Sequence, residues 1–225
     1  MKIIKRIISI FLFILCIFFI YLGFNDNTKK NNLEIVEEIK DNSQNEEEFF
    51  KNLEEKNIIC KINIPKVTED YVVMGTDNSY YLHHSIDGKK SKSGALFFDY
   101  RTSDEDSVKI IYGHNMDNGT FFSNIVKFYD EDFRRDIKEV TLDYGKTIKK
   151  YKPIAIFEVD LDVDRDFIYS NIRNLDKYGR DKFIQNIEKR GFFFEEFSQN
   201  KDVLLLSTCN NKKNDARICL VLEEN

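Results

Sequence analysis

Short apolar runs separated by polar segments recur along the chain from residue 58 onward. Each run is six to nine residues long and rich in β-branched or aromatic residues, as strands are. Eight strands are predicted, at residues 58–65, 70–75, 94–100, 108–114, 140–145, 151–159, 203–208 and 216–222. Because few helical patterns lie between them, the sequence predicts a mainly β fold. A closed or nearly closed barrel of about eight strands is favoured over a doubly wound sheet.

Apolar residues at helical spacing predict three further elements. Phe50 and Leu53 belong to an amphipathic stripe that predicts a helix over 45–57, just before the first strand. Helical inserts are predicted at 118–137 and 174–192, with stripes that we interpret as packing against the core. The second insert lies in a long connection, of the kind that usually carries a binding or functional element.

The N-terminal segment has a different pattern. Residues 7–24 contain no charge and follow Lys2, Lys5 and Arg6. As a helix they would extend roughly 27 Å, close to the hydrocarbon thickness of a bilayer. The alternative is a cleaved signal peptide, but its apolar region is usually shorter and ends in small residues, unlike the YLGF found here. We therefore expect a retained single-pass anchor in the cell membrane, with residues 1–6 cytoplasmic and the rest of the chain extracellular.

The whole chain has 225 residues, which gives room for one domain with a hydrophobic core. We expect a polar stalk at 25–44 and a single folded domain at 45–225. The net charge is −5, so the chain offers no bulk positive charge to neutralise phosphates. Nucleic acid is therefore not an expected partner, whereas the membrane is, through the N-terminal helix.

Four cysteines limit the chemistry that the chain can support. Cys16 lies in the predicted anchor, which leaves Cys60, Cys209 and Cys219, an odd number, so at least one thiol is unpaired within a single chain. No cysteines and histidines are spaced as zinc ligands, and we expect neither a metal nor a cofactor. Cys60 and Cys219 have apolar neighbours within predicted strands, which is typical of core thiols.

Cys209 and His114 each end an apolar run. Taken alone, each is more typical of a structural residue than of a catalytic one. Arg217 follows Cys209 after a short polar loop, so a hairpin would bring its guanidinium near the sulfur, and a fixed cation favours the thiolate. His83 and His84 have no cysteine or carboxylate cluster nearby in sequence, and we interpret them as surface or partly packed residues.

Taken together, three segments resemble the class B sortases, exported cysteine transpeptidases of Gram-positive bacteria. The segment with the cysteine and the arginine is LLLSTCNNKKNDARICLVL, the histidine segment is YGHNMDNGTFFSNIVKF, and the segment before it is DNSYYLHHSIDGKKSKSGALFFDYR. The resemblance covers roughly residues 45–222, with the segments in the family's order. It implies a closed sortase-type barrel of about eight strands, with an N-terminal helix and helical inserts.

The resemblance also implies a set of site residues. Cys209 would be the nucleophile, His114 the proton donor and acceptor, and Arg217 the group that holds the substrate backbone or stabilises the oxyanion. The groove for the substrate peptide would be lined by Asn78, Leu82, Phe167, Ile168 and Ser207. No motif places a carboxylate beside His114, and the unranked candidates for that role are Asp99, Asp117 and Asp215.

The implied reaction is cleavage of a C-terminal sorting motif after its threonine, through a thioacyl-enzyme, followed by transfer to a peptidoglycan amine. The implied partners are surface proteins that carry the motif and a peptidoglycan precursor or cross-bridge. Two alternatives are an anchored β-barrel binding module and a cysteine peptidase that releases its product to water. The three residues in their motif contexts favour an enzyme over a binding module. Transfer and hydrolysis share the same thiolate chemistry, so the sequence does not separate them.

Overall fold

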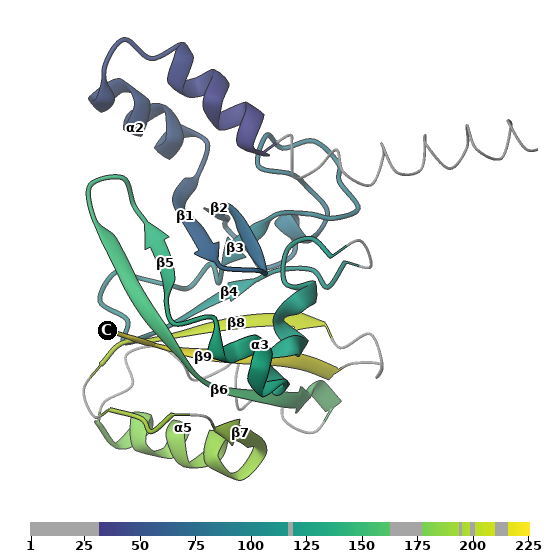
Figure 1. The fold of residues 1–225 in the computed structure, drawn as a ribbon. Helices are drawn as coiled ribbons and strands as arrows, with labels where there is room; N and C mark the ends of the chain where they lie inside the picture. Colours follow the sequence, from purple (N-terminus) through teal and green to yellow (C-terminus); the bar gives the residue numbers. More distant parts are fainter. Residues whose placement is uncertain (1–31, 117–118, 163–176, 194, 199–200, 210–215) are drawn as a thin grey trace, which may run out of the picture.

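The computed structural model describes residues 32–116, 119–162, 177–193, 195–198, 201–209 and 216–225, which form a curled sheet with helices at its two ends (Figure 1). The strands are β1 (Ile58–Ile64), β2 (Thr68–Met74), β3 (Leu96–Phe98), β4 (Val108–Tyr112), β5 (Val140–Asp143), β6 (Ile148–Asp160), β7 (Gly191–Phe193), β8 (Val203–Cys209) and β9 (Ala216–Glu224). The helices with described bounds are one at 32–41, α2 (Glu46–Glu55), η1 (Tyr80–Leu82), η2 (Ser123–Tyr129), α3 (Glu131–Arg135) and α5 (Lys177–Arg190).

Eight of these strands close into a barrel. Their order is β5-β1-β2-β3-β4-β8-β9-β6, and β6 pairs with β5 to complete the ring, while β7 adds to β6 beside the ring. The β2–β3 and β4–β8 pairs are parallel and the other pairs are antiparallel. The predicted mainly β fold with a closed barrel of about eight strands is therefore confirmed. The three-residue β7 is a ninth strand that the sequence pattern did not predict.

The central strand β8 shows why some strands are continuously apolar. Leu204 and Leu206 face the barrel interior, whereas Val203 and Leu205 face a second apolar cluster outside the wall. All four side chains are buried, because both faces of the strand are covered. Elsewhere in the ring, β1 instead alternates buried positions with exposed or half-buried ones, as a strand with one solvated face does.

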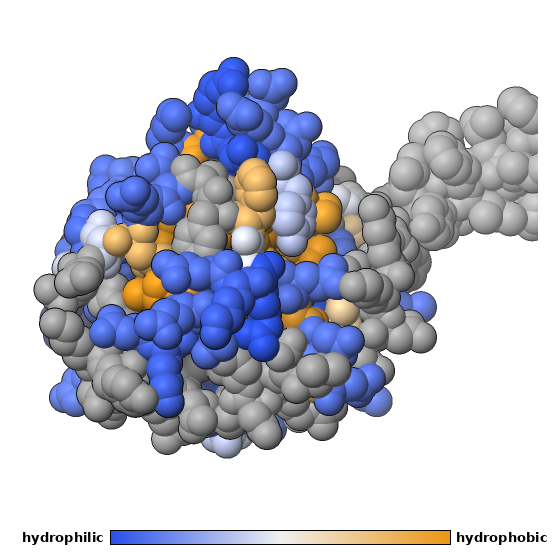
Figure 2. Space-filling model, turned by 90° about the horizontal axis from the view of Figure 1, so that it is seen from below, coloured by the Kyte–Doolittle hydropathy of each residue, from blue (hydrophilic) through white to orange (hydrophobic). Residues whose placement is uncertain are grey.

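The outer cluster is covered by α5, which lies along the bottom of the barrel in Figure 1. Phe183 and Ile187 are buried in that cluster, and they are four residues apart, on one face of the helix. Figure 2 views the molecule from this side and shows hydrophilic side chains across the middle of the face, with apolar side chains beside them. The helix predicted at 174–192 is thus present as an amphipathic cover for one outer face of the wall.

A third cluster lies at the opposite end of the barrel, beneath α2 and the helix at 32–41 (Figure 1). The Asn45 side chain caps α2 by accepting a hydrogen bond from the Glu48 amide at 2.9 Å, as expected for the helix predicted at 45–57. Residues 32–41 fall within the predicted stalk but form a helix with Val36 and Ile39 buried. Apolar residues at helical spacing therefore pack this part of the segment onto the domain.

The insert predicted as one helix at 118–137 is broken in two. η2 buries Ile125 and Phe128 in the barrel interior, and α3 begins after Asp130. Asp130 has an extended backbone, and its side chain accepts a hydrogen bond from the Phe133 amide, so it starts a new helix instead of continuing the first.

The predicted membrane location requires a correction. The proposed anchor at 7–24 lies outside the described residues. In the part of the chain that is described, no helix is long and apolar enough to cross a membrane; α5, for example, has only 14 residues. The prediction of a single-pass membrane protein with an extracellular domain is therefore not supported.

Candidate active site

The hairpin of β8 and β9 places Cys209 directly opposite Arg217. Side chains alternate along each strand, and Leu206 and Ile218 point into the barrel, so Cys209 and Arg217 lie on the outer face of the wall. Cys219 is on the same face but fully buried, whereas Cys209 is only partly buried at the end of its strand. The spacing of eight residues thus brings the thiol and the guanidinium side by side, as the sequence predicted.

His114 reaches the same place from β4, which runs parallel to β8. The Gly113 amide donates a hydrogen bond to the Ser207 carbonyl at 3.1 Å and so extends the pairing beyond the end of β4. A Cβ on Gly113 would lie 2.5 Å from Leu96 Cδ2 and 2.7 Å from Phe122 Cδ2. Only glycine fits between these two side chains, which makes it essential for the path of the chain into His114.

The His114 ring is oriented by a backbone carbonyl. Its Nε2 lies 2.8 Å from the Leu82 oxygen, and because a carbonyl can only accept, Nε2 carries the hydrogen. Nδ1 is then the ring nitrogen left for the Cys209 sulfur, with which His114 shares a side-chain hydrogen bond. Asn115 adds a further link, since its Nδ2 donates to the Cys209 carbonyl at 3.0 Å. Sequence reasoning found neither the Leu82 carbonyl nor Asn115.

The thiol and the imidazole shift each other's pKa in opposite directions. The hydrogen bond to His114 is the main cause of a lowered pKa for Cys209; burial opposes it and the positive charge of Arg217 assists it. The hydrogen bond to Cys209 is likewise the main cause of a raised pKa for His114, helped by the Leu82 carbonyl and opposed by burial and by Arg217. Both shifts favour a thiolate next to an imidazolium.

The other described thiols behave differently. Burial raises the pKa of Cys219 to about 12, although a hydrogen bond with Ser207 and the charge of Arg217 act against it. Burial also raises the pKa of Cys60 far above its usual range. Among the described cysteines, Cys209 is therefore the one suited to act as a nucleophile near neutral pH.

Three of the five residues predicted to line the peptide groove lie within the described part of the chain. The Asn78 side chain binds the Asp99 carboxylate and the Tyr100 amide, and Leu82 meets His114 through its carbonyl. Ser207 is buried two residues before Cys209. Phe167 and Ile168 lie outside the described residues.

Carboxylates play no direct part in orienting His114 within the described residues. Of the three candidates, Asp99 is bonded to Arg101, Tyr112 and Asn78, while Asp117 and Asp215 lie outside the described residues. Nor do any three histidine, cysteine, aspartate or glutamate side chains of the described ranges group as metal ligands would.

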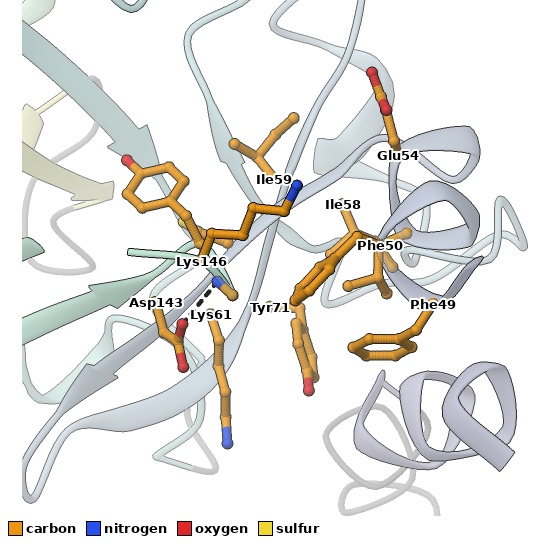
Figure 3. Close-up of a pocket in the computed structure, with 13 residues that line it drawn as sticks. Phe49, Phe50, Glu54, Ile58, Ile59, Lys61, Tyr71, Asp143 and Lys146 are labelled. Carbon is orange, nitrogen blue, oxygen red and sulfur yellow. Dashed lines mark hydrogen bonds between the residues drawn. The ribbon is translucent and has the colours of Figure 1, made fainter. Parts of the chain in front are cut away.

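A separate cavity of about 360 Å³ lies between α2, β1 and the turn from β5 to β6 (Figure 3). Aromatic rings from Phe49, Phe50 and Tyr71 stand on one side, and the Asp143 carboxylate accepts a hydrogen bond from the Gly145 amide. None of its lining residues is a candidate catalytic residue. The catalytic arrangement therefore lies elsewhere, on the outer face of the barrel.

Comparisons with known proteins agree with this fold, although no family model matches the chain. Over 173 residues the chain is 29% identical to sortase B of Listeria monocytogenes, covering 75% of this chain and 69% of that protein. The crystal structure of Clostridium perfringens sortase B has a TM-score of 0.70 at 28% identity, covering 78% of this chain and 98% of that one. A substrate complex of Staphylococcus aureus sortase B, at 16% identity, shares the fold with a TM-score of 0.72, covering 87% of this chain and 95% of that one.

The barrel and its relatives identify the chain as a homologue of the sortases, enzymes of the cysteine transpeptidase class. More particularly, it is a homologue of sortase B, and the resemblance to class B sortases read from the sequence is confirmed.

Proposed function

We propose that this enzyme cleaves a sorting motif near the C-terminus of a substrate protein, after the threonine, and transfers the acyl part to a peptidoglycan amine. The observation that carries the proposal is the hydrogen-bonded pair of Cys209 and His114, whose pKa values move in opposite directions beside Arg217. This is the charge arrangement that a thiol nucleophile and its proton donor need.

In the first half of the reaction, the Cys209 thiolate attacks the threonine carbonyl carbon and a tetrahedral intermediate forms. The peptide C–N bond then breaks, and the departing amine takes a proton from the His114 imidazolium, leaving a thioester on Cys209. Arg217 supplies a fixed positive charge where the oxyanion develops, a contribution of about 100-fold or more in rate.

In the second half, an acceptor amine attacks the thioester carbonyl and gives its proton to His114. The C–S bond breaks, an amide forms, and the thiolate–imidazolium pair is restored. Water in place of the amine would give hydrolysis by the same steps, so the acceptor decides between transfer and release.

We propose that Asn78, Leu82, Phe167, Ile168 and Ser207 contact the sorting peptide. Support comes from position: Leu82 adjoins His114, and Ser207 lies on the same face of β8 as Cys209. The proposed partners are surface proteins that carry the motif and a peptidoglycan precursor or cross-bridge that offers the amine.

Fluorogenic peptides with LPxTG-like and NPxTx-like motifs test this function, each with and without an added amine such as triglycine. We expect cleavage after threonine, and with triglycine a transfer product identified by its mass. Cys209→Ala should abolish cleavage, and His114→Gln and Arg217→Gln should each lower kcat/KM by about 100-fold or more. Cleavage by Cys209→Ala at the parent rate would refute the proposal, and hydrolysis alone in the presence of amine would refute the transfer step.

Matched controls use the same residue types outside the site. Cys60→Ala changes a buried thiol of β1, His84→Gln a half-buried ring stacked on Tyr80 at 4.1 Å, and Arg135→Gln an exposed cation of α3. These variants should keep kcat/KM near that of the parent, provided that they remain folded by circular dichroism.

A further inference from the structure

The Asp99 carboxylate is almost fully buried just after β3, with 4% of the residue exposed. A buried carboxylate is costly unless it is fully hydrogen-bonded. Arg101 binds it through two nitrogens, with Nε 2.8 Å from Oδ1 and Nη2 2.7 Å from Oδ2. Tyr112 and Asn78 each donate to Oδ2 at 3.0 Å. The two further donors come from different parts of the chain, so the carboxylate joins segments that are distant in sequence.

Both of those segments lead to His114: the Tyr112 segment carries it, and the Asn78 segment contacts it through the Leu82 carbonyl. Tyr112 is the last residue of β4 and lies two residues before His114. Asn78 lies two residues before η1, and its Oδ1 accepts a hydrogen bond from the Tyr100 amide at 2.9 Å. η1 ends at Leu82, whose carbonyl accepts the hydrogen bond from His114 Nε2. A closed ring of contacts therefore runs from the histidine through Asp99 to the carbonyl that orients the histidine.

We propose that Asp99 is a positioning residue for the transpeptidase reaction, which holds the strand that carries His114 and the η1 carbonyl that orients it at a fixed separation. Asp99 does not touch Cys209 or the peptide; it acts through Tyr112 and Asn78. The inference rests on the proposed roles of Cys209 and His114, and it adds a residue that sets their geometry.

Aromatic contacts connect the same segments independently of the hydrogen bonds to Asp99. The Phe97 ring packs against Tyr112 at 5.3 Å and against Tyr81 of η1 at 6.4 Å between ring centres. These aromatic contacts hold β4, β3 and η1 together, so a variant that loses one hydrogen bond to Asp99 should fold with its catalytic geometry loosened.

The test is the pH profile of Cys209 alkylation by iodoacetamide, measured on the full-length chain, with Cys209→Ala as background. Asp99→Asn and Tyr112→Phe should each move the midpoint of the profile to higher pH by about 0.5–1 unit, the equivalent of one weakened hydrogen bond. The reason is that a looser His114 stabilises the thiolate less. Among the described residues, the charged or titratable groups that act on His114 are Cys209 and Arg217, and neither is changed by these substitutions.

The direction of the shift separates positioning from charge. Loss of the negative charge in Asp99→Asn would by itself favour the thiolate and lower the midpoint, and Tyr112→Phe changes no charge. A rise in both variants supports the proposal. An unchanged midpoint in Tyr112→Phe, or a lower midpoint in Asp99→Asn, overturns it. If Asp99→Asn does not fold, Tyr112→Phe decides alone.

Two controls match the buried side chains that are changed. Asp106→Asn alters a buried carboxylate beyond the other end of β4, where it accepts from the Ser103 amide at 2.7 Å. Tyr151→Phe alters a buried tyrosine of β6. Neither should move the midpoint, and an equal shift in them would overturn the proposal. Because alkylation needs no peptide, failure of the parent to cleave any sorting peptide would refute the proposed function and leave this result separate.

Discussion

Replacement of Gly113 by alanine is expected to disturb the active site, although Gly113 has no proposed role in the reaction itself. The new Cβ would lie 2.5 Å from Leu96 Cδ2 and 2.7 Å from Phe122 Cδ2, and both of these side chains are buried in the barrel interior. Overpacking of this kind costs about 1–3 kcal/mol, offset by about 0.4–1 kcal/mol because alanine restricts the unfolded chain. We expect a net loss of about 1–2 kcal/mol in the free energy of unfolding.

The activity should fall further than the stability. His114 is the next residue, and relief of the clash should shift its backbone relative to Cys209 and to the Leu82 carbonyl. A displacement of about 1 Å in a catalytic group costs about 100-fold in rate. The measurements are kcat/KM with the best sorting peptide and urea unfolding followed by circular dichroism.

A matched control is Gly75→Ala, whose Cβ would lie 3.2 Å from the Tyr81 ring and 3.4 Å from the Asp77 backbone oxygen, without the close clashes of Gly113→Ala. It should change kcat/KM less than Gly113→Ala does. If Gly113→Ala keeps both the stability and the kcat/KM of the parent, the requirement for glycine before His114 is refuted.

Three further predictions concern charge, a tight turn and a buried pair. Arg217 lowers the pKa of both the thiol and the imidazole, so Arg217→Gln should move both limbs of the bell-shaped kcat/KM profile to higher pH; an unmoved profile would contradict this. Gly145 has φ +81°, and its Cβ would lie 1.9 Å from the Phe50 ring, so Gly145→Ala should cost about 1–3 kcal/mol in urea unfolding without changing the pH profile. Glu223 is fully buried and accepts hydrogen bonds from the Ser198 amide and hydroxyl at 2.7 and 2.9 Å. Glu223→Gln should therefore lower stability by about 1–3 kcal/mol, and an unchanged unfolding midpoint would show that this contact is dispensable.

Most of the strands could be predicted because the burial of their side chains gives each strand a recognisable pattern of apolar residues. β8 and β9 are continuous apolar runs, since their two faces meet the barrel interior and the outer cluster. β7 left no such pattern, because its three residues follow α5 directly and are a strand only through their pairing with β6. The break between η2 and α3 was not predicted, because the apolar stripe continues across it. The break depends on the extended backbone of Asp130 and on its side chain, which caps α3.

The choice of cysteine could be predicted only in part. Cys209 and Cys219 both border apolar residues, and both lie on the outer face of the wall. What separates them is tertiary: Cys219 is packed in the outer cluster with α5 residues, whereas Cys209 lies at the end of β8 and faces His114. The order of motifs indicated Cys209, but its lowered pKa depends on β4 and β9, which bring His114 and Arg217 beside the end of β8.

The orienting group of His114 was the least predictable part of the site, because a search for a carboxylate cannot find a backbone carbonyl that every residue carries. The structure nevertheless has one local signal for it, at Gly94. Its φ is +62°, and a Cβ there would lie 2.3 Å from the Tyr81 oxygen and 2.9 Å from the Leu82 oxygen. The Ala95 amide in turn donates to the Tyr81 carbonyl at 2.9 Å. A side chain at position 94 would push η1 and its last carbonyl out of place, so the glycine before β3 permits the close approach on which the histidine's orientation depends.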